Sequence, residues 1–233
     1  MKLTDSMESP VPHPAPDKPA ARARLPRRVR ETQMIDVATE VFGKHGYHAA
    51  SMDQIAEQAQ ISKPMIYAYF ESKEGLYSAC LRRAGADLLE SIGASSMTDG
   101  GTEQRLWESF LAYFRYIRDN RAAWQLVRVD SFYEVAAFRE IAESVHEGLR
   151  DVVAGLVNIS PDASSGAGYA EDERRNAIAC AMLGAAEALG SRWIENSSEP
   201  DPESPCRHLM SFLWLGIEDL ANGEVWTEQR IRV

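Results

Sequence analysis

The strongest constraint on the fold lies in residues 51–73, "SMDQIAEQAQISKPMIYAYFESK", where two short helical patterns are separated by a break. Ser51 stands three residues before Gln54, which is the spacing of a capping box at a helix start. Ser62 offers a second N-cap after the break. Pro64 then falls in the first turn of the next helix, where its missing N–H has no partner to lose. The stretch therefore predicts a helix-turn-helix.

Helical periodicity also dominates the rest of the chain. From about residue 27 apolar residues recur at steps of three and four until Gly43 and Gly46, which should end the first helix. Later helices are expected to begin near Ser72, Thr102, Arg121 and Glu134, and two more to follow the loops 160–168 and 196–204. Because no stretch alternates with the period of a strand, we expect an all-α fold of about nine helices.

Composition excludes several classes of protein. The chain is 45% hydrophobic and 26% charged, as in an ordinary globular protein, and no apolar run reaches the about 18 residues of a membrane span. Its start lacks the apolar core of a secretory signal. Three cysteines without CxxC spacing predict reduced thiols in a cytoplasmic protein, with a Cys180–Cys206 disulfide as the less favoured alternative.

The sequence also contains none of the common catalytic motifs of enzymes. GxSxG, HExxH and a phosphate-binding loop with its Lys are all missing, and "SSGAG" at residues 164–168 lacks the strand–helix context of such a loop. The five histidines are scattered and form no zinc ligand set. We therefore predict no catalytic residues, no metal site and no cofactor.

Charge is distributed unevenly along a chain whose net charge is −10. Residues 1–83 carry 12 Lys and Arg against 10 Asp and Glu, whereas residues 84–233 carry 13 against 25. This asymmetry suggests two halves with different partners. Residues 1–26, rich in Pro and Ala, are expected to be a disordered arm. Arginines cluster where this arm meets the first helix, so the segment either solubilises the chain or enters a DNA minor groove: Arg22, Arg24, Arg27, Arg28 and Arg30.

In a helix-turn-helix the N-terminal turns of the second helix meet the major groove, and flanking groups contact phosphates. The orphan N–H groups at that helix start, a cation and two tyrosine hydroxyls suit this task. The predicted DNA-binding residues are Ser51, Ser62, Lys63, Pro64, Tyr67, Tyr69 and Lys73. The alternative is structural: one of the two tyrosines only fills the core, and Ser51 only caps its helix.

The segment "VFGKHGYHAASMDQIAEQAQISKPMIYAYFESKEGLY" resembles the DNA-binding part of TetR-family transcriptional regulators. The shared pattern covers roughly residues 28–80 and comprises Phe42, Gly46-Tyr47, Ser51, Ile55-Ala56, Ser62, Tyr67, Phe70, Lys73 and Leu76. Two positions depart from it. Gln60 replaces the usual Gly, so the turn either avoids a left-handed conformation or bears a cost of about 1 kcal/mol. Tyr69 stands where His is frequent.

The resemblance implies a three-helix DNA-binding domain at residues 27–75 and a helical effector-binding and dimerisation domain at residues 76–233. The small residues of one late helix and the apolar surface of the last favour a four-helix interface between two protomers, although burial within one monomer would also cover them. The predicted interface residues are Ala181, Gly184, Ala185, Ala188, Leu209, Phe212, Leu213 and Leu220. A dimer would present two recognition helices to a two-fold operator.

Aromatic residues of the middle helices are candidates for an effector pocket: Trp107, Phe110, Phe114, Trp124 and Phe138. A packed core would use the same residue types, so the sequence leaves both open. Arginines that could meet an anionic head group, or simply be solvated, are Arg115, Arg118, Arg128 and Arg139. The whole chain also resembles the family's regulators of fatty-acid metabolism, which implies a long-chain acyl-CoA or a fatty acid as effector.

The sequence thus predicts a cytoplasmic, homodimeric regulator that binds double-stranded DNA, acts as a repressor and is released by a small apolar or amphipathic effector. Two other functions stay open. One is a transcriptional activator of the same family. The other is a helical adaptor that uses its helix-turn-helix for protein contacts and does not bind DNA.

Overall fold

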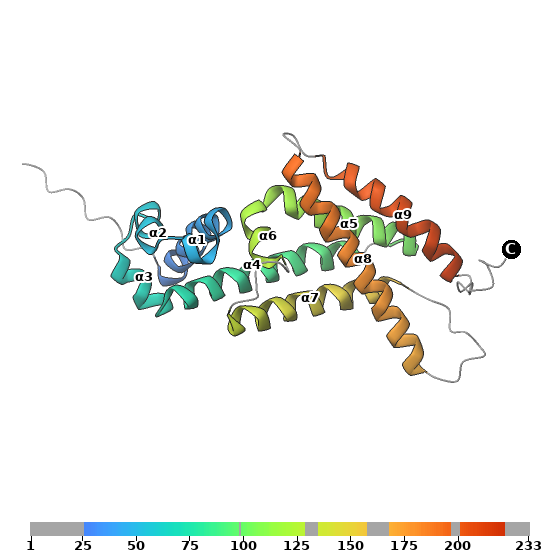
Figure 1. Cartoon of the computed structure of the whole chain (residues 1–233), viewed down its shortest axis with the longest axis horizontal. Helices are drawn as coiled ribbons and strands as arrows, with labels where there is room; N and C mark the ends of the chain where they lie inside the picture. Colours follow the sequence, from blue (N-terminus) through green and yellow to red (C-terminus); the bar gives the residue numbers. More distant parts are fainter. Residues whose placement is uncertain (1–25, 98, 129–134, 158–167, 197–200, 222–233) are drawn as a thin grey trace, which may run out of the picture.

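The computed structural model describes residues 26–97, 99–128, 135–157, 168–196 and 201–221, with the backbone alone for 168–171 and 215–221. In this part of the chain nine helices follow one another: α1 Arg27–Ala49, α2 Met52–Gln58, α3 Lys63–Phe70, α4 Lys73–Ser96, α5 Thr102–Asp119, α6 Arg121–Val127, α7 Ala136–Leu156, α8 Gly168–Asn196 and α9 Glu203–Ala221. The predicted all-α fold is confirmed (Figure 1). None of the described helices combines the length and the apolar character needed to cross a bilayer.

The first helix ends differently from the prediction. It runs through Gly43 without interruption and leaves helical geometry at Gly46, whose φ of 74° and ψ of 167° kink the chain three residues before Ala49. Gly46 takes this conformation because it has no Cβ to oppose a positive φ. Gly43 serves another purpose, since a Cβ there would lie 2.6–2.8 Å from Ala122 of α6.

Helices α1, α2 and α3 enclose a small core of their own at the left end of Figure 1. Met34, Ala38 and Phe42 of α1 meet Ile55 of α2 and Ile66 of α3, each with at most 2% of its surface exposed. Burial of these side chains fixes the angle between α2 and α3. The exposed face of α3 is therefore held by a rigid three-helix unit.

Helix α4 belongs to both halves of the molecule. It contacts α1 and α3 near its start and α5, α6 and α7 farther along. Two buried aromatic side chains of this second core pair their polar atoms, as expected of a well-packed interior. Tyr116 donates a hydrogen bond to Ala84 O over 2.9 Å, and Trp124 Nε1 donates to the Tyr113 hydroxyl over 3.3 Å. Helices α8 and α9 pack on α5 and on each other at the far end.

The close approach of α1 and α6 gives a test of how tightly the two halves are joined. Gly43→Ala should lower the free energy of unfolding by about 1–3 kcal/mol, because its methyl group overlaps the backbone of Ala122. The same change at Gly93 of α4, where an added Cβ meets nothing within 4 Å, should raise it by about 0.5–1 kcal/mol. Urea unfolding at one protein concentration measures both. Equal effects at the two positions would contradict a tight α1–α6 contact.

Candidate nucleic-acid interface

The turn between α2 and α3 adopts the left-handed conformation that its sequence disfavours. Gln60 has a φ of 55°. The N–H of Gln60 bonds to Glu57 O and that of Ile61 bonds to Ala56 O, both over 3.0 Å, which is the hydrogen-bond pattern of a Schellman motif. Glycine usually occupies the left-handed position of this motif. Of the two possibilities that the sequence left open, the structure therefore shows the strained one.

The start of α2 forms only half of the predicted capping box. Ser51 Oγ accepts a hydrogen bond from the Asp53 N–H over 3.2 Å, so the expected cap is present. The side chain of Gln54 makes no return bond to the Ser51 backbone and instead lines a cleft between α1, α2 and α6. Ser51 is exposed at the start of α2, which leaves its hydroxyl accessible.

Helix α3 presents one face to solvent and buries the other. Ser62 is its N-cap without a side-chain hydrogen bond, and Pro64 lies in its first turn as predicted. Both are exposed, together with Tyr67, whose exposed fraction is 39%. Sequence reasoning missed Met65, 38% exposed on the same short helix, although the helical period separates it from buried Ile66 and Phe70.

Two lysines flank this face, and both have protein partners. Lys63 Nζ lies 2.9 Å from Asp53 Oδ2, and this hydrogen bond raises the pKa of the exposed lysine. Lys73 Nζ donates to His48 O over 3.1 Å and lies 4.9 Å from the centre of the Tyr47 ring. Partial burial lowers the pKa of Lys73. Its ammonium group is thus fixed against the end of α1, with donors to spare for a phosphate.

Tyr69 was considered either as a DNA contact or as a core residue, and the structure places it between fully exposed and fully buried. Its ring is half-buried next to Phe70, and the Arg27 guanidinium carbon lies 5.1 Å from the ring centre. This contact places the first residue of α1 beside α3. Arg28 is exposed there and Arg30 is half-buried. The predicted disorder of the arm, and its arginines at 22 and 24, lie outside the described residues.

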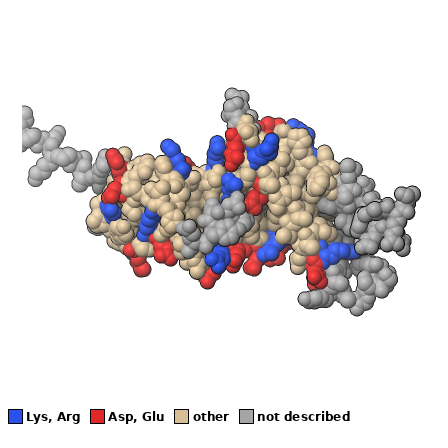
Figure 2. Space-filling view, in the orientation of Figure 1, with Lys and Arg blue, Asp and Glu red and all other residues tan. Residues whose placement is uncertain are grey.

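Acidic and basic side chains are interspersed over the face of the molecule in Figure 2, including the part formed by the first three helices. The net charge of the whole chain, −10, opposes long-range attraction to DNA.

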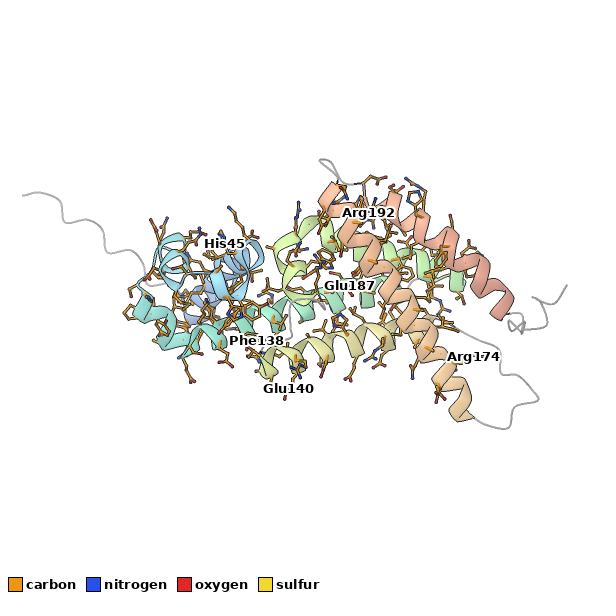
Figure 3. All side chains as sticks on the ribbon, in the orientation of Figure 1. His45, Phe138, Glu140, Arg174, Glu187 and Arg192 are labelled. Carbon is orange, nitrogen blue, oxygen red and sulfur yellow. The ribbon has the colours of Figure 1, made fainter. Side chains whose placement is uncertain are left out.

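The predicted effector-pocket residues lie in different surroundings. Phe110 and Phe114 are buried in the core, and Trp107 lines a groove between α5 and α9. Trp124 borders an interior cavity of about 20 Å³. Phe138 lies at the start of α7, where Figure 3 labels it; its ring centre is 4.9 Å from that of Tyr47 and 4.4 Å from that of Tyr77.

A larger groove of about 580 Å³ lies between α7 and α8. Sequence reasoning had selected few of the residues that line it. The full lining is Arg139, Ala142, Glu143, His146, Glu147, Arg150, Cys180, Leu183, Gly184 and Glu187. Of the arginines considered for a head group, Arg139 lines this groove. Arg128 lies 3.8 Å from Glu195, and Arg118 lies 2.7 Å from Asp119. Arg115 is exposed on α5.

The residues predicted for a dimer interface are distributed over α8 and α9. Ala181, Gly184 and Ala188 are exposed on α8, and Phe212 of α9 has 74% of its surface exposed. Ala185 and Leu213 are half-buried, whereas Leu209 is buried within the monomer. The side chain of Leu220 lies outside the described residues.

The three cysteines occupy different surroundings. Cys80 and Cys206 are buried, donate weakly to Ile35 O and Trp107 O, and have thiol pKa values raised by burial to about 12. Cys180 is exposed on α8 and forms no disulfide with Cys206. Among the described side chains, no group of three or more His, Cys, Asp or Glu residues is arranged to hold a metal ion.

Comparison with known proteins identifies the architecture. The model for bacterial regulatory proteins of the tetR family matches residues 34–80, and that for the tetracyclin repressor-like C-terminal domain matches residues 102–216. The HTH-type transcriptional activator FasR of Mycolicibacterium smegmatis is 32% identical over 197 residues, which cover 83% of this chain and 85% of FasR. The chain belongs to the TetR family. It is a DNA-binding transcriptional regulator and not an enzyme, which decides against the adaptor hypothesis.

Two solved structures of transcriptional regulators extend the likeness to most of the fold. A TetR-like regulator from a Rhodococcus species is 30% identical with a TM-score of 0.68, covering 84% of this chain and 99% of its own. FadR of Bacillus subtilis, crystallised with stearoyl-CoA, has a TM-score of 0.65 and covers 78% of this chain and 96% of its own. Because the identity is only 17%, the likeness to FadR is evidence for a shared fold and for nothing more.

The strained turn residue gives a second prediction. Gln60→Gly should raise the free energy of unfolding by about 0.5–1 kcal/mol, because relief of the left-handed strain exceeds the extra freedom of glycine in the unfolded chain. Gln58→Gly, two residues earlier in α2, should lower it by about the same amount. Thermal or urea unfolding distinguishes these opposite signs. Destabilisation by both changes would show that Gln60 is not strained.

The third prediction concerns Lys63. Lys63→Ala should make the log–log dependence of DNA affinity on salt shallower by about 0.9, the value for one lost phosphate contact. Arg207→Ala is the control, since Arg207 pairs with Asp201 and Glu203 at the opposite end of the molecule. Fluorescence anisotropy at several salt concentrations provides the slopes. An unchanged slope for Lys63→Ala would show that its ammonium stays with Asp53 in the complex.

Proposed function

We propose that the protein is a homodimeric regulator that binds a two-fold operator through α3 and is controlled by a small apolar or amphipathic effector. The observation that carries the DNA-binding part is the exposed N-terminal face of α3. Ser62, Lys63, Pro64 and Tyr67 lie there on a helix whose other face is locked into the core by Ile66. Ser51, Tyr69 and Lys73 flank this face and are proposed to contact phosphates.

Dimerisation is supported by the surfaces of α8 and α9. The small exposed residues Ala181, Gly184 and Ala188 would let a partner helix approach closely. Phe212 exposes 74% of its surface, which burial in an interface would remove from water. A two-fold interface at this end leaves both α3 helices free, because α3 lies at the opposite end of the molecule (Figure 1).

The proposed effector is a long-chain acyl-CoA or a fatty acid. The small space beside Trp124 is lined mainly by apolar side chains, with Arg128 and Glu187 also on its lining, and the α7–α8 groove next to it has a charged rim. An amphipathic molecule suits such a combination. The same fold in Bacillus subtilis FadR was crystallised with stearoyl-CoA, which supports this class of ligand here.

A route from this region to the DNA-binding helices runs through aromatic contacts. Phe138 of α7 packs against Tyr47 at the end of α1 and Tyr77 of α4. Tyr47 in turn contacts Lys73, which precedes Tyr77 by one helical turn. A shift of α7 on ligand binding would move these rings and change the spacing of the two α3 helices. A hundredfold loss of operator affinity requires about 2.7 kcal/mol of coupling.

The direction of regulation has two candidates. Release from DNA by the effector corresponds to a repressor, as expected from the sequence. Activation is favoured by one observation, the name of the 32% identical FasR of Mycolicibacterium smegmatis, which is a transcriptional activator. In-vitro transcription from the regulated promoter, with and without the protein, separates the two by the sign of the change.

The proposed function is tested by fluorescence anisotropy on duplex DNA from upstream of the protein's own gene, titrated with a long-chain acyl-CoA. We expect a complex that forms at low salt and a change in its affinity of about a hundredfold, equivalent to the coupling above. Free CoA serves as the control for the head group. Binding that ignores acyl-CoA would retain the DNA-binding regulator and reject this effector, whereas no binding would reject this operator.

A further inference from the structure

A side chain of α1 reaches the turn between α2 and α3. Gln33 Nε2 donates a hydrogen bond to Ala59 O over 3.2 Å and so joins residues that are 26 positions apart. Gln33 is half-buried and Ala59 has none of its surface exposed, so water competes poorly for this carbonyl. The side chain therefore supplies a donor to a buried backbone oxygen at the end of α2, where a helix leaves its last carbonyls without partners.

The bonded carbonyl belongs to the peptide that precedes the left-handed residue. Ala59, the C-cap of α2, has a φ of −75° and a ψ of −6°, and Gln60 follows with a φ of 55°. The ψ of Ala59 and the φ of Gln60 together set the direction in which Ala59 O points. If Gln60 relaxed to a negative φ, this peptide plane would rotate and Ala59 O would turn away from Gln33. The hydrogen bond thus favours the left-handed form of the turn over its alternatives.

The strain at Gln60 makes this bond more consequential than it would be beside a glycine. A left-handed conformation is costly for a residue with a Cβ, and the net contribution of one hydrogen bond is of similar size. The backbone bonds of the Gln60 and Ile61 N–H groups also favour the turn. Gln33 adds a further bond from outside the α2–α3 segment, and this bond opposes the strain.

Helix α1 contacts the region of α3 at both of its ends. Gln33 bonds to the turn that precedes α3, and the Arg27 guanidinium lies 5.1 Å from the ring centre of Tyr69 near the end of α3. Between these contacts Ile66 is buried in the core that α3 shares with α1. A change in the turn would therefore move the exposed N-terminal residues of α3 relative to α1.

The Gln33 amide is satisfied on its donor side and not on its acceptor side. Its Oε1 is buried and accepts no hydrogen bond from the described residues. An unpaired buried oxygen is unfavourable, and an apolar side chain of the same length would avoid it. Packing alone therefore does not account for a glutamine here, whereas the donor to Ala59 O does.

We infer that Gln33 is a positioning residue for DNA recognition: its amide holds the Ala59–Gln60 peptide in the left-handed turn and so fixes the placement of α3 on the operator. This inference rests on the proposed function, because it takes α3 as the helix that contacts DNA. Gln33 acts through the turn and does not itself bind the operator.

Substitution of Gln33 in two turn backgrounds tests this role by fluorescence anisotropy, on a DNA duplex selected by the wild-type protein from a random-sequence pool. Gln33→Met keeps the length of the side chain but cannot donate. It should raise the Kd about fivefold, which corresponds to a binding-competent turn in about one fifth of the molecules. Relative to Gln60→Gly alone, the same change should raise the Kd less than about twofold, because glycine adopts the left-handed conformation without strain. Gln104→Met, on the exposed surface of α5, is the control for the chemical change.

Two further measurements distinguish positioning from a direct DNA contact and from an effect on folding alone. The log–log slope of affinity against salt should be the same in Gln33→Met as in the wild-type protein, because no phosphate contact is lost. Amide hydrogen exchange in residues 56–66 should be at least about fivefold faster in Gln33→Met and should slow again when Gln60→Gly is added. Gln33→Asn is the second variant if methionine prevents folding, since its amide is one methylene too short to reach Ala59 O.

The outcomes separate this inference from the proposed function. Equal losses of affinity in the two turn backgrounds would overturn the positioning role, as would a shallower salt slope, which indicates a phosphate contact by Gln33. Tyr67→Ala reports on α3 directly. Loss of affinity in Tyr67→Ala without loss in Gln33→Met overturns the positioning role alone. No loss in either variant, or no DNA selected by the wild-type protein, rejects α3 as the DNA-contacting helix and this inference with it.

Discussion

The structure depends on α4 being shared by two hydrophobic cores. Its first turns pack on α1 and α3, and the remainder packs on α5, α6 and α7. A continuous helix of 24 residues is about 36 Å long and does not bend easily without a break in its hydrogen bonds. A displacement at one end must then appear at the other. The DNA-binding helices and the C-terminal helical domain are mechanically joined for this reason.

Two further contacts restrict how the halves can move. Gly43 brings α1 against Ala122 of α6 with no room for a side chain. Phe138, Tyr47 and Tyr77 form a cluster of rings between α7, α1 and α4. Close packing makes such contacts adopt one arrangement or another rather than deform continuously. The proposed change in the spacing of the recognition helices would use such contacts.

The core of the C-terminal helices leaves little internal space. Buried aromatic residues fill most of it, and little space remains beside Trp124. Ligand binding would therefore exchange side-chain packing for ligand packing. The free energy of that exchange is available to move α7, on which Phe138 and the groove residues lie.

The sequence predicted correctly those features that depend on interactions between residues close together in the chain. The side-chain cap at Ser51, the start of α3 after Ser62, the position of Pro64 and the period that buries Ile66 were predictable, because each depends on neighbours within one or two turns. The end of α1 was predicted less well. Gly43 looked like a terminator alongside Gly46, but its role is set by Ala122, which is distant in the sequence and adjacent in space.

The sequence by itself determined the all-helical class, the helix-turn-helix and the family, since periodicity, caps and an ordered motif are properties of the linear chain. Only the tertiary structure decided that Gln60 is left-handed, that Lys63 and Lys73 bind Asp53 and His48, and that Phe138 joins the two halves. It also decided that the groove lies between α7 and α8. Cavities and aromatic contacts arise from helices far apart in the chain, so the same aromatic residue types predict a core and a pocket equally well.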